Sequence, residues 1–262
     1  MVAMPAVGTA GRRGPRRSDL VVAAGCVLAV LLFGSPDRGA RPAPSASAGA
    51  APVAAAGRVP VPGAVDADGV QRRVGGGEGL ALTFDDGPDP RWTPAVLDLL
   101  RRHGATATFC VVGQYVAAHP ELVRRMADEG HALCDHTWTH DEALASRTTA
   151  TLRTELRRTY DAVVSATGGR APLYFRAPAG RWNPRVVAEA RQLGLRPLGW
   201  SVDPTDWRRP PPEVIADRVL KGATPGAIVL LHDGYGHRGA TVAALDTILT
   251  TLAARRLSLV AP

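Results

Sequence analysis

The stretch LTFDDGPDP, Leu82–Pro90, places two aspartates side by side at the end of an apolar run that is typical of a buried strand. Adjacent carboxylates repel one another, and a strand end offers little to neutralise both. Asp-Gly-Pro is ordinary turn chemistry, so a simple turn accounts for Asp86 and Gly87 but leaves Asp85 unexplained. The alternative is a cation beside the pair, with the second carboxylate available for acid–base chemistry.

Similar apolar runs recur from residue 80 onward and alternate with six stretches that carry helix signals. The first of these stretches, for example, has Pro94 in its first turn and Gly104 at its end. The strand-like runs are Leu80–Phe84, Thr106–Val112, Ala132–Asp135, Leu173–Arg176, Pro197–Val202, Ala227–His232 and Leu257–Val260. This alternation predicts parallel β-α-β units, and either a barrel or a doubly wound sheet fits it. No Gly-x-Gly-x-x-Gly turn follows the first run, so a dinucleotide site has no support.

Polar clusters follow five of these runs, each at the point where the expected strand ends. They are Asp85-Asp86, HTWTH (136–140), RAPAG (176–180), DPTDW (203–207) and LLHDG (230–234). In a parallel barrel the carboxyl ends of the strands meet at one rim, where such folds build their active sites. Five clusters at the same end therefore predict a functional site at that rim.

His136 and His140 are four residues apart and can face one ion from a single turn. Together with one carboxylate they make a three-ligand set that leaves open positions for water and substrate, as catalytic zinc requires. The HTWTH stretch lacks the glutamate of a His-Glu-x-x-His protease, so the base must come from elsewhere. One aspartate of the Asp85-Asp86 pair would bind the metal, and the other would activate water. The cation would also offset the repulsion between the two carboxylates.

The formal charge of +7 and the sequence pI near 10.1 first suggest a nucleic-acid-binding protein. Residues 1–57, however, carry 6 Arg against 2 Asp, and the remainder carries 25 basic against 22 acidic residues. The basic residues of the remainder form no run or aromatic-interleaved patch, so no nucleic-acid partner is expected.

The N-terminus reads as a targeting segment. A basic stretch, GRRGPRRSD, precedes the apolar run Leu20–Phe33, which has the length of a signal peptide or short membrane anchor. We expect such a segment over residues 1–34, a disordered linker rich in Ala, Pro, Ser and Gly over 35–77, and a folded domain over 78–262. The domain is expected outside the cytoplasm, either secreted or held at the outer face of the cytoplasmic membrane. Whether the segment is cleaved stays open.

Two cysteines, Cys110 and Cys134, lie in the part of the chain that is expected to be exported. An oxidising compartment would permit a disulfide between them. Two small buried hydrophobic residues in neighbouring strands are an equally good interpretation.

Taken in order, TFDDGP, HTWTH, RAPAG, DPTDW and LLH resemble the five motifs of the polysaccharide deacetylase family, the NodB-homology domains of carbohydrate esterase family 4. The resemblance extends from about Leu80 to the C-terminus. It implies a distorted (β/α)7 barrel rather than an open sheet. It also implies metal-dependent removal of N- or O-acetyl groups from a polysaccharide.

The resemblance also implies a role for each matching residue. Asp86, His136 and His140 would bind Zn²⁺ or another divalent ion such as Co²⁺. Asp85 would be the general base, and His232 would be the general acid that protonates the leaving amine.

Supporting roles are implied in the same way. Arg176 would pair with Asp85 and hold it ionised, and Asp206 would orient His232. Trp207 and Leu230 would line the small pocket for the acetyl methyl group. The backbone N–H of Ala179 would stabilise the oxyanion of the tetrahedral intermediate.

The chain departs from the family pattern at three positions. Ala179 stands where an aromatic residue is frequent, so a sugar-stacking surface is in doubt there. Asp135 replaces a frequent Asn and either tightens metal binding or points away. Cys134 replaces a frequent Gly, and we interpret it as a packing residue.

The substrate implied by the resemblance is an N-acetylglucosamine polymer, either peptidoglycan or a chitin-like chain. We expect the protein to be a monomer. An esterase for O-acetyl groups of xylan and a non-catalytic carbohydrate-binding barrel are the alternatives. The second alternative predicts a broken catalytic set, and no member of the set is missing from this sequence.

Overall fold

The structure is a computed structural model that describes residues 65–76 and 79–262. The targeting segment expected over residues 1–34 lies outside the described residues, as do residues 35–64 and 77 of the linker expected over 35–77. Within the described part of the chain, no helix combines the length and the apolar character needed to cross a bilayer.

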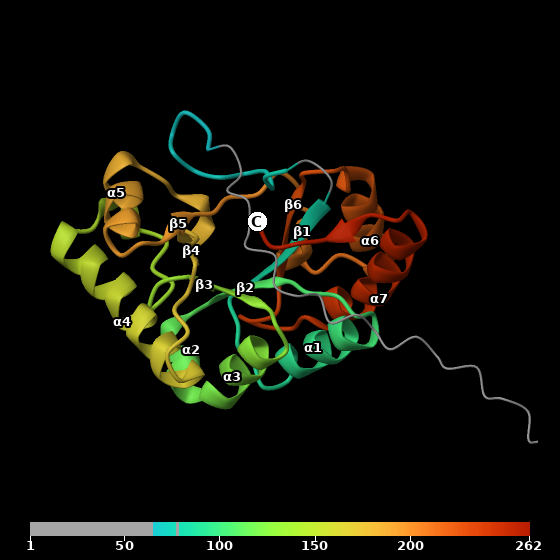
Figure 1. The fold of residues 1–262 in the computed structure, drawn as a ribbon, viewed down its shortest axis with the longest axis horizontal. Coiled ribbons are helices and arrows are strands. Elements are labelled where there is room, and N and C mark those ends of the chain that lie inside the picture. The colour runs from blue at the N-terminus through green and yellow to red at the C-terminus, as the bar shows by residue number, and fades with distance from the viewer. Residues whose placement is uncertain (1–64, 77–78) are drawn as a thin grey trace, which may run out of the picture. The chain divides into compact units, whose positions relative to one another are not determined.

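Seven parallel strands form one curled sheet, which makes the distorted barrel that the motif set implies (Figure 1). The order of six strands is β5-β4-β3-β2-β1-β6. The seventh strand, β7, pairs with the first two residues of β1, Gly79 and Leu80. The strands are β1 (Gly79–Asp85), β2 (Thr108–Val111), β3 (Ala132–Asp135), β4 (Tyr174–Phe175), β5 (Arg196–Pro197), β6 (Ile228–His232) and β7 (Ser258–Leu259). The central strand β1 is buried along its whole length, as expected for a parallel strand with both faces covered.

In the described part of the chain, seven α-helices cover the outside of the sheet (Figure 1). They are α1 (Thr93–Arg102), α2 (Gly113–Ala118), α3 (Pro120–Asp128), α4 (Thr149–Thr167), α5 (Pro184–Gln192), α6 (Pro212–Gly222) and α7 (Gly239–Ala254). Local sequence sets several of their ends. Thr148 caps α4 by accepting a hydrogen bond from the N–H of Thr151, and left-handed Gly168 ends that helix. The sequence predicted six of the seven helices and missed the short α2.

Side chains alternate between two cores along each strand. Leu80, Leu82 and Phe84 of β1 pack outward into the main core beneath the helices. Ala81 belongs to the smaller core inside the barrel, which also contains Cys110. This alternation also turns Asp85 toward the interior, because it lies four residues after Ala81 on the same face.

Cys110 of β2 and Cys134 of β3 are directly opposite in the strand register and form a disulfide inside the barrel. Their Cα atoms are 4.2 Å apart. Of the two interpretations that the sequence left open, the structure therefore has the disulfide.

The barrel closes between β5 and β6, which do not pair as regular strands. After β5 the chain crosses to β6, where Val202 bridges Val229. The sequence predicted a strand over Pro197–Val202, but only its first residue lies in β5 because the following residues make this crossing.

Residues 65–76 contact both sides of this opening, next to the end of β5 and the start of β6. Gln71 bridges Leu198 in parallel, and Arg73 bridges Ala227 in antiparallel. Val70 and the side chain of Gln71 are buried. The sequence predicted that these residues belong to the linker, but the structure packs them as part of the folded domain. The other predicted domain boundaries remain predictions.

Candidate metal centre and active site

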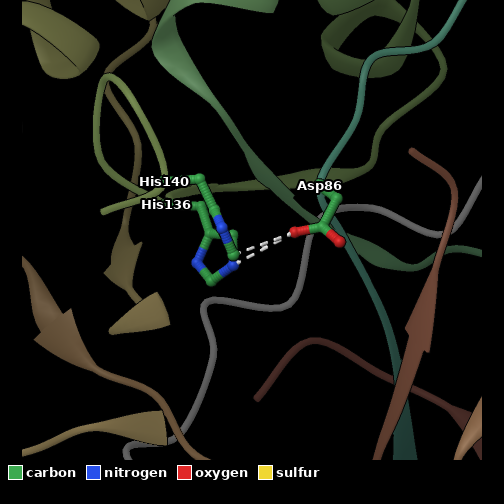
Figure 2. Close-up of side chains that lie close together, drawn as sticks. All are labelled: Asp86, His136 and His140. Atoms are coloured by element: carbon green, nitrogen blue, oxygen red, sulfur yellow. Dashed lines mark ion pairs between the residues drawn. The ribbon is translucent and has the colours of Figure 1, made fainter. Parts of the chain in front are cut away.

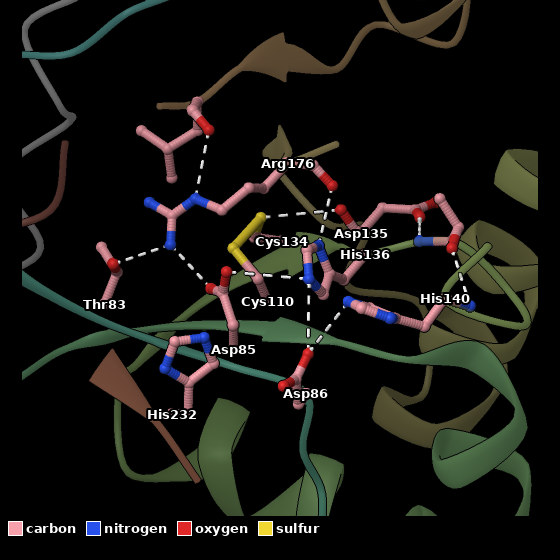
Figure 3. A network of polar contacts seen from close by, with 12 residues as sticks. Thr83, Asp85, Asp86, Cys110, Cys134, Asp135, His136, His140, Arg176 and His232 are labelled. Carbon is pink, nitrogen blue, oxygen red and sulfur yellow. Dashed lines mark hydrogen bonds and ion pairs between the residues drawn. A yellow bond between two sulfur atoms is a disulfide. The ribbon is translucent and has the colours of Figure 1, made fainter. Parts of the chain in front are cut away.

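The predicted site residues gather at the carboxyl ends of the strands, where β1, β3, β4 and β6 stop (Figure 3). Asp86 follows β1, His136 follows β3, Arg176 follows β4, and His232 is the last residue of β6. The parallel topology therefore brings together residues that are up to about 150 positions apart in the sequence.

Asp86, His136 and His140 form a compact cluster whose ligand atoms all lie within 4.8 Å of one another. Figure 2 shows both imidazoles facing the Asp86 carboxylate. Asp86 Oδ1 is 3.5 Å from His136 Nε2 and 3.3 Å from His140 Nε2. It is buried and makes no hydrogen bond, which is costly unless another group completes the site.

The donor set of this cluster fits a divalent cation. His136 Nδ1 lies 2.8 Å from the carbonyl oxygen of Arg176, and it donates to that oxygen because a carbonyl only accepts. A hydrogen bond from Nδ1 of this kind fixes the ring and would direct Nε2 toward the ion. Two such imidazoles with one carboxylate are the ligand types of catalytic zinc.

Burial and the neighbouring charges shift the pKa values of all three residues in this cluster. Burial opposes ionisation of Asp86, but pairing with His136 and the charges of the nearby histidines lower its pKa to about 2. Burial likewise disfavours charged His136, but Asp85 and Asp86 outweigh burial and raise its pKa. Burial and the charge of His136 lower the pKa of His140. Cation binding would therefore release protons.

Asp85 is directed by a buried guanidinium. Arg176 Nη1 donates to Asp85 Oδ1 at 2.6 Å and to Thr83 Oγ1 at 2.8 Å. The other two nitrogens of this guanidinium, Nε and Nη2, donate to the carbonyl oxygens of Leu198 and Gly199. The other carboxylate oxygen of Asp85 is 3.7 Å from His136 Nε2, so it faces the metal centre.

His232 is held from behind by Asp206. His232 Nδ1 donates to Asp206 Oδ1 at 2.7 Å, which leaves Nε2 for a substrate. The other oxygen of Asp206 accepts from the N–H of His232 and from Thr241 Oγ1. Burial disfavours charged His232, but the hydrogen bond to Asp206 and the carboxylate charges raise its pKa to about 9.

The three predicted substrate-binding residues have different surroundings. Ala179 lies in a 3-10 turn with a left-handed φ of 52°. Trp207 is exposed, with the Arg208 guanidinium over its ring. Leu230 is buried on β6, two residues before His232 and on the same strand face. Their contacts with an acetyl group stay predictions.

Asp135 does not join the cation cluster. Its Oδ1 accepts a hydrogen bond from the N–H of Thr137 at 2.8 Å. Burial raises the pKa of Asp135, and the charge of Glu155 adds to this effect. Of the two possibilities for this departure from the family pattern, the structure has the carboxylate turned away from the metal.

Sequence reasoning missed three residues of the segment that follows His232. Asp233 is buried and accepts from Thr93 Oγ1 at 2.5 Å, and burial together with nearby carboxylates raises its pKa to about 7. Arg238 is buried 3.9 Å from Asp86 Oδ2 and donates to the carbonyl oxygen of Tyr235. The Tyr235 ring lies 5.6 Å from the His140 ring and is 59 % exposed. The only signal was the stretch DGYGHRG directly after a predicted site strand.

Several known proteins are similar to this chain. Residues 73–198 match the family model described as polysaccharide deacetylase. A chitooligosaccharide deacetylase of Rhizobium leguminosarum bv. trifolii is 45% identical over 191 residues, which are 69% of this chain and 88% of that protein. A peptidoglycan-N-acetylglucosamine deacetylase of Listeria monocytogenes is 43% identical over 173 residues, 66% of this chain and 35% of that protein.

Solved structures match as well. A family 4 carbohydrate esterase from Streptomyces lividans in complex with acetate has a TM-score of 0.65 and 34% identity, and the match covers 70% of this chain and 91% of that chain. A CE4 family pseudoenzyme from Bacillus anthracis has a TM-score of 0.66 and 28% identity, with 72% of this chain and 65% of that chain covered. The fold alone therefore does not separate an enzyme from a pseudoenzyme, and the site residues must.

Proposed function

Because the chain belongs to the polysaccharide deacetylase family, we propose that it removes N-acetyl groups from N-acetylglucosamine residues of a chitin-like chain or of peptidoglycan. Two relatives above 40% identity are named for deacetylation of such substrates, which favours N-acetyl over O-acetyl groups. The observation that carries the proposal is the complete set at one rim: a three-ligand cluster, a carboxylate beside it and a protonated imidazole.

Asp86, His136 and His140 would hold the cation, which we propose to be Zn²⁺ or a similar divalent ion such as Co²⁺. When bound, it supplies Lewis acidity that polarises the acetyl carbonyl and eases deprotonation of the attacking water. The buried Oδ1 of Asp86, which makes no hydrogen bond, supports this assignment.

The chain's own residues then manage two protons. Asp85 accepts the proton of the attacking water, and Arg176 holds that carboxylate in place. His232 donates a proton from Nε2 to the leaving nitrogen as the C–N bond breaks, so acetate and a free amine are formed. Because its pKa is raised to about 9, His232 carries this proton at neutral pH. Trp207 and Leu230 would contact the acetyl methyl group, and the Ala179 N–H would donate to the oxyanion.

An extracytoplasmic location and attachment to a membrane through residues 1–34 are part of the proposal. The disulfide between Cys110 and Cys134 supports it, because such bonds persist in oxidising compartments. A monomer without a nucleic-acid partner remains the expected state.

The test is acetate release from N-acetylglucosamine oligomers and from peptidoglycan by the full chain, with and without added Zn²⁺. Asp85→Asn should lower kcat by roughly 10²–10⁴-fold, the usual contribution of a general base. Zn²⁺ binding by this variant should persist, because Asp85 is not one of the three clustered ligands. The matched control is Asp217→Asn, which removes an exposed carboxylate paired with Lys221. A chain that binds Zn²⁺ but releases acetate from neither polymer would contradict the proposal and favour the non-catalytic carbohydrate-binding barrel.

A further inference from the structure

The turn that carries both histidine ligands has an unfavourable backbone. Thr137 has a φ of 68° and His140 a φ of 57°, both in the left-handed region. A β-branched residue such as Thr137 rarely adopts this conformation, so surrounding contacts must hold it. The turn must nevertheless keep two imidazole nitrogens within 3.5 Å of one carboxylate oxygen of Asp86.

Hydrogen bonds within the barrel rim hold part of this turn. The N–H of Thr137 donates to Asp135, and the N–H of His140 donates to Thr137 Oγ1 at 3.1 Å. The carbonyl oxygens of Thr137 and Trp138 accept from the N–H groups of Gly113 and Gln114 at the start of α2. None of these bonds involves Thr139, the residue that directly precedes the ligand His140.

Thr139 is held from outside the barrel by Glu155, in the second turn of α4. Glu155 Oε2 accepts from the N–H of Thr139 at 2.8 Å and from Thr139 Oγ1 at 2.9 Å. Glu155 is only 9 % exposed, although a glutamate is rarely buried without a partner of opposite charge. Its carboxylate thus accepts hydrogen bonds from two neutral donors of the turn and forms no salt bridge among the described residues.

Two further side chains of α4 contact the same region. The Arg158 guanidinium lies 4.0 Å from the centre of the Trp138 ring. Thr159 packs so closely against Gly113 that a Cβ atom there would lie 2.5 Å from Thr159 Oγ1. Positions 155, 158 and 159 lie on one face of a helix, so α4 presents a single surface to the metal-binding turn.

We infer that Glu155 is a positioning residue that sets the cation affinity of the site by fixing Thr139, and through it His140. This inference rests on the proposed function, because it assumes a cation at Asp86, His136 and His140. Glu155 itself is outside the ligand cluster, so its effect acts through the turn.

The experiment is a calorimetric titration of the metal-free full chain with Zn²⁺. Glu155→Leu should raise the Kd roughly 10-fold or more, the usual effect of removing a group that orients a metal ligand. Glu155→Gln should raise it only about 3-fold, since a neutral acceptor forms hydrogen bonds about half as strong as those of a carboxylate. Thr139→Val, at an exposed position, should also raise the Kd about 3-fold because it removes one of the two bonds.

The matched control is Glu189→Leu on α5. Glu189 is similarly buried at 6 % exposed, but it pairs with Arg153 and does not contact the turn. This variant should lose stability, measured by denaturant unfolding of the metal-free chain, while its Zn²⁺ Kd stays at the wild-type value.

Four results would overturn the inference. A folded Glu155→Leu variant with a Kd within about 2-fold of wild type would do so, as would an equal rise in Glu189→Leu. If Glu155→Leu does not fold, an unchanged Kd in Thr139→Val decides against the inference. A wild-type chain that binds no Zn²⁺ would overturn the proposed function itself and this inference with it.

Discussion

At the scale of single residues, several residues of the site have backbone conformations that non-glycine residues rarely adopt. Asp86, Thr137, His140 and Ala179 all have positive φ values, and all four lie in the motifs that predicted the site. Each such residue costs on the order of 1–3 kcal/mol, which the surrounding contacts must offset. The motifs therefore specify backbone shape as well as side-chain chemistry.

The proton on His232 depends on one neighbour, Asp206, and this dependence is testable by pH. The raised pKa of about 9 means that the general acid stays protonated at neutral pH and loses its proton as pH rises through that value. In Asp206→Asn the alkaline limit of kcat/KM should move down from about pH 9 toward about 6.5, the ordinary pKa of histidine. The measurement is kcat/KM on an N-acetylglucosamine oligomer from pH 6 to 10.

A matched control for this pH shift is Asp246→Asn. Asp246 pairs with His103 at 2.9 Å on the surface, far from the motifs in sequence, and its loss should leave the profile unchanged. An alkaline limit that stays in place in Asp206→Asn would contradict the role of His232 as the protonated donor.

At the scale of elements, the site depends on close contact between α2, α4 and the metal-binding turn. Gly113 begins α2, and its N–H donates to the carbonyl oxygen of Thr137. A Cβ atom at this position would lie 2.5 Å from both the Trp138 ring and Thr159 Oγ1. Only glycine lets the helix, the turn and α4 approach so closely.

Gly113→Ala should therefore lower both stability and cation affinity. We expect about 1–3 kcal/mol of destabilisation from overpacking, because the backbone of Thr159 is also within 3.1 Å and cannot move freely. The Zn²⁺ Kd should rise, since the displaced Trp138 belongs to the turn between the two histidine ligands. Denaturant unfolding and calorimetric titration measure the two effects.

Gly168→Ala is the control for Gly113→Ala, because it strains the backbone without creating a steric clash. Gly168 ends α4 with a φ of 69°, and a Cβ atom there would meet no other atom within 4 Å. Alanine should cost about 1–2 kcal/mol from the left-handed conformation alone and leave the Zn²⁺ Kd unchanged. A similar loss of Zn²⁺ affinity in both glycine variants would count against specific packing at Gly113.

At the scale of the whole molecule, the barrel interior is held by a covalent bond as well as by packing. The disulfide joins neighbouring strands β2 and β3, and Cys110 is also opposite Asp85 of β1 in the register. The bond thus lies inside the barrel just below the catalytic rim (Figure 3).

Replacing both cysteines by alanine should lower the free energy of unfolding by about 3 kcal/mol, since the bond closes a loop between positions 24 residues apart. The measurement is the denaturant midpoint with and without a thiol reductant present during unfolding. Reductant should shift the wild-type midpoint toward that of the variant and leave the variant unchanged. Equal midpoints for both proteins without reductant would disprove a stabilising role.

The closure of the barrel by residues 65–76 is a second property of the whole molecule. Val70 is fully buried in this segment, whereas Val65 is 53 % exposed. Val70→Ala should destabilise the domain by about 2 kcal/mol through lost burial and the remaining cavity. Val65→Ala should change stability by less than about 0.5 kcal/mol. Identical unfolding curves for the two variants would show that this segment is not part of the folded domain.

Much of the fold and site could be predicted from the sequence because the signals are local. Alternating apolar runs and helix punctuation predicted the parallel sheet and six helices, and the five motifs predicted the barrel. The ligand types also carried their own chemistry, so His136, His140 and one aspartate of the Asp85-Asp86 pair could be named before any geometry was known. The family resemblance then implied Asp86 as the third ligand. The pairs Asp85–Arg176 and His232–Asp206 followed from the family resemblance, and the structure has both.

What the sequence alone determined is thus the order of elements and the chemical identity of the site, since each depends on residues that are near one another in the chain. Only the tertiary structure decided which distant groups hold that site in shape. The disulfide, the closure by Gln71, the position of Arg238 beside Asp86 and the bonds from Glu155 to Thr139 all depend on strand register and side-chain direction. No local pattern encodes these contacts, because they arise when segments packed around one barrel meet in space.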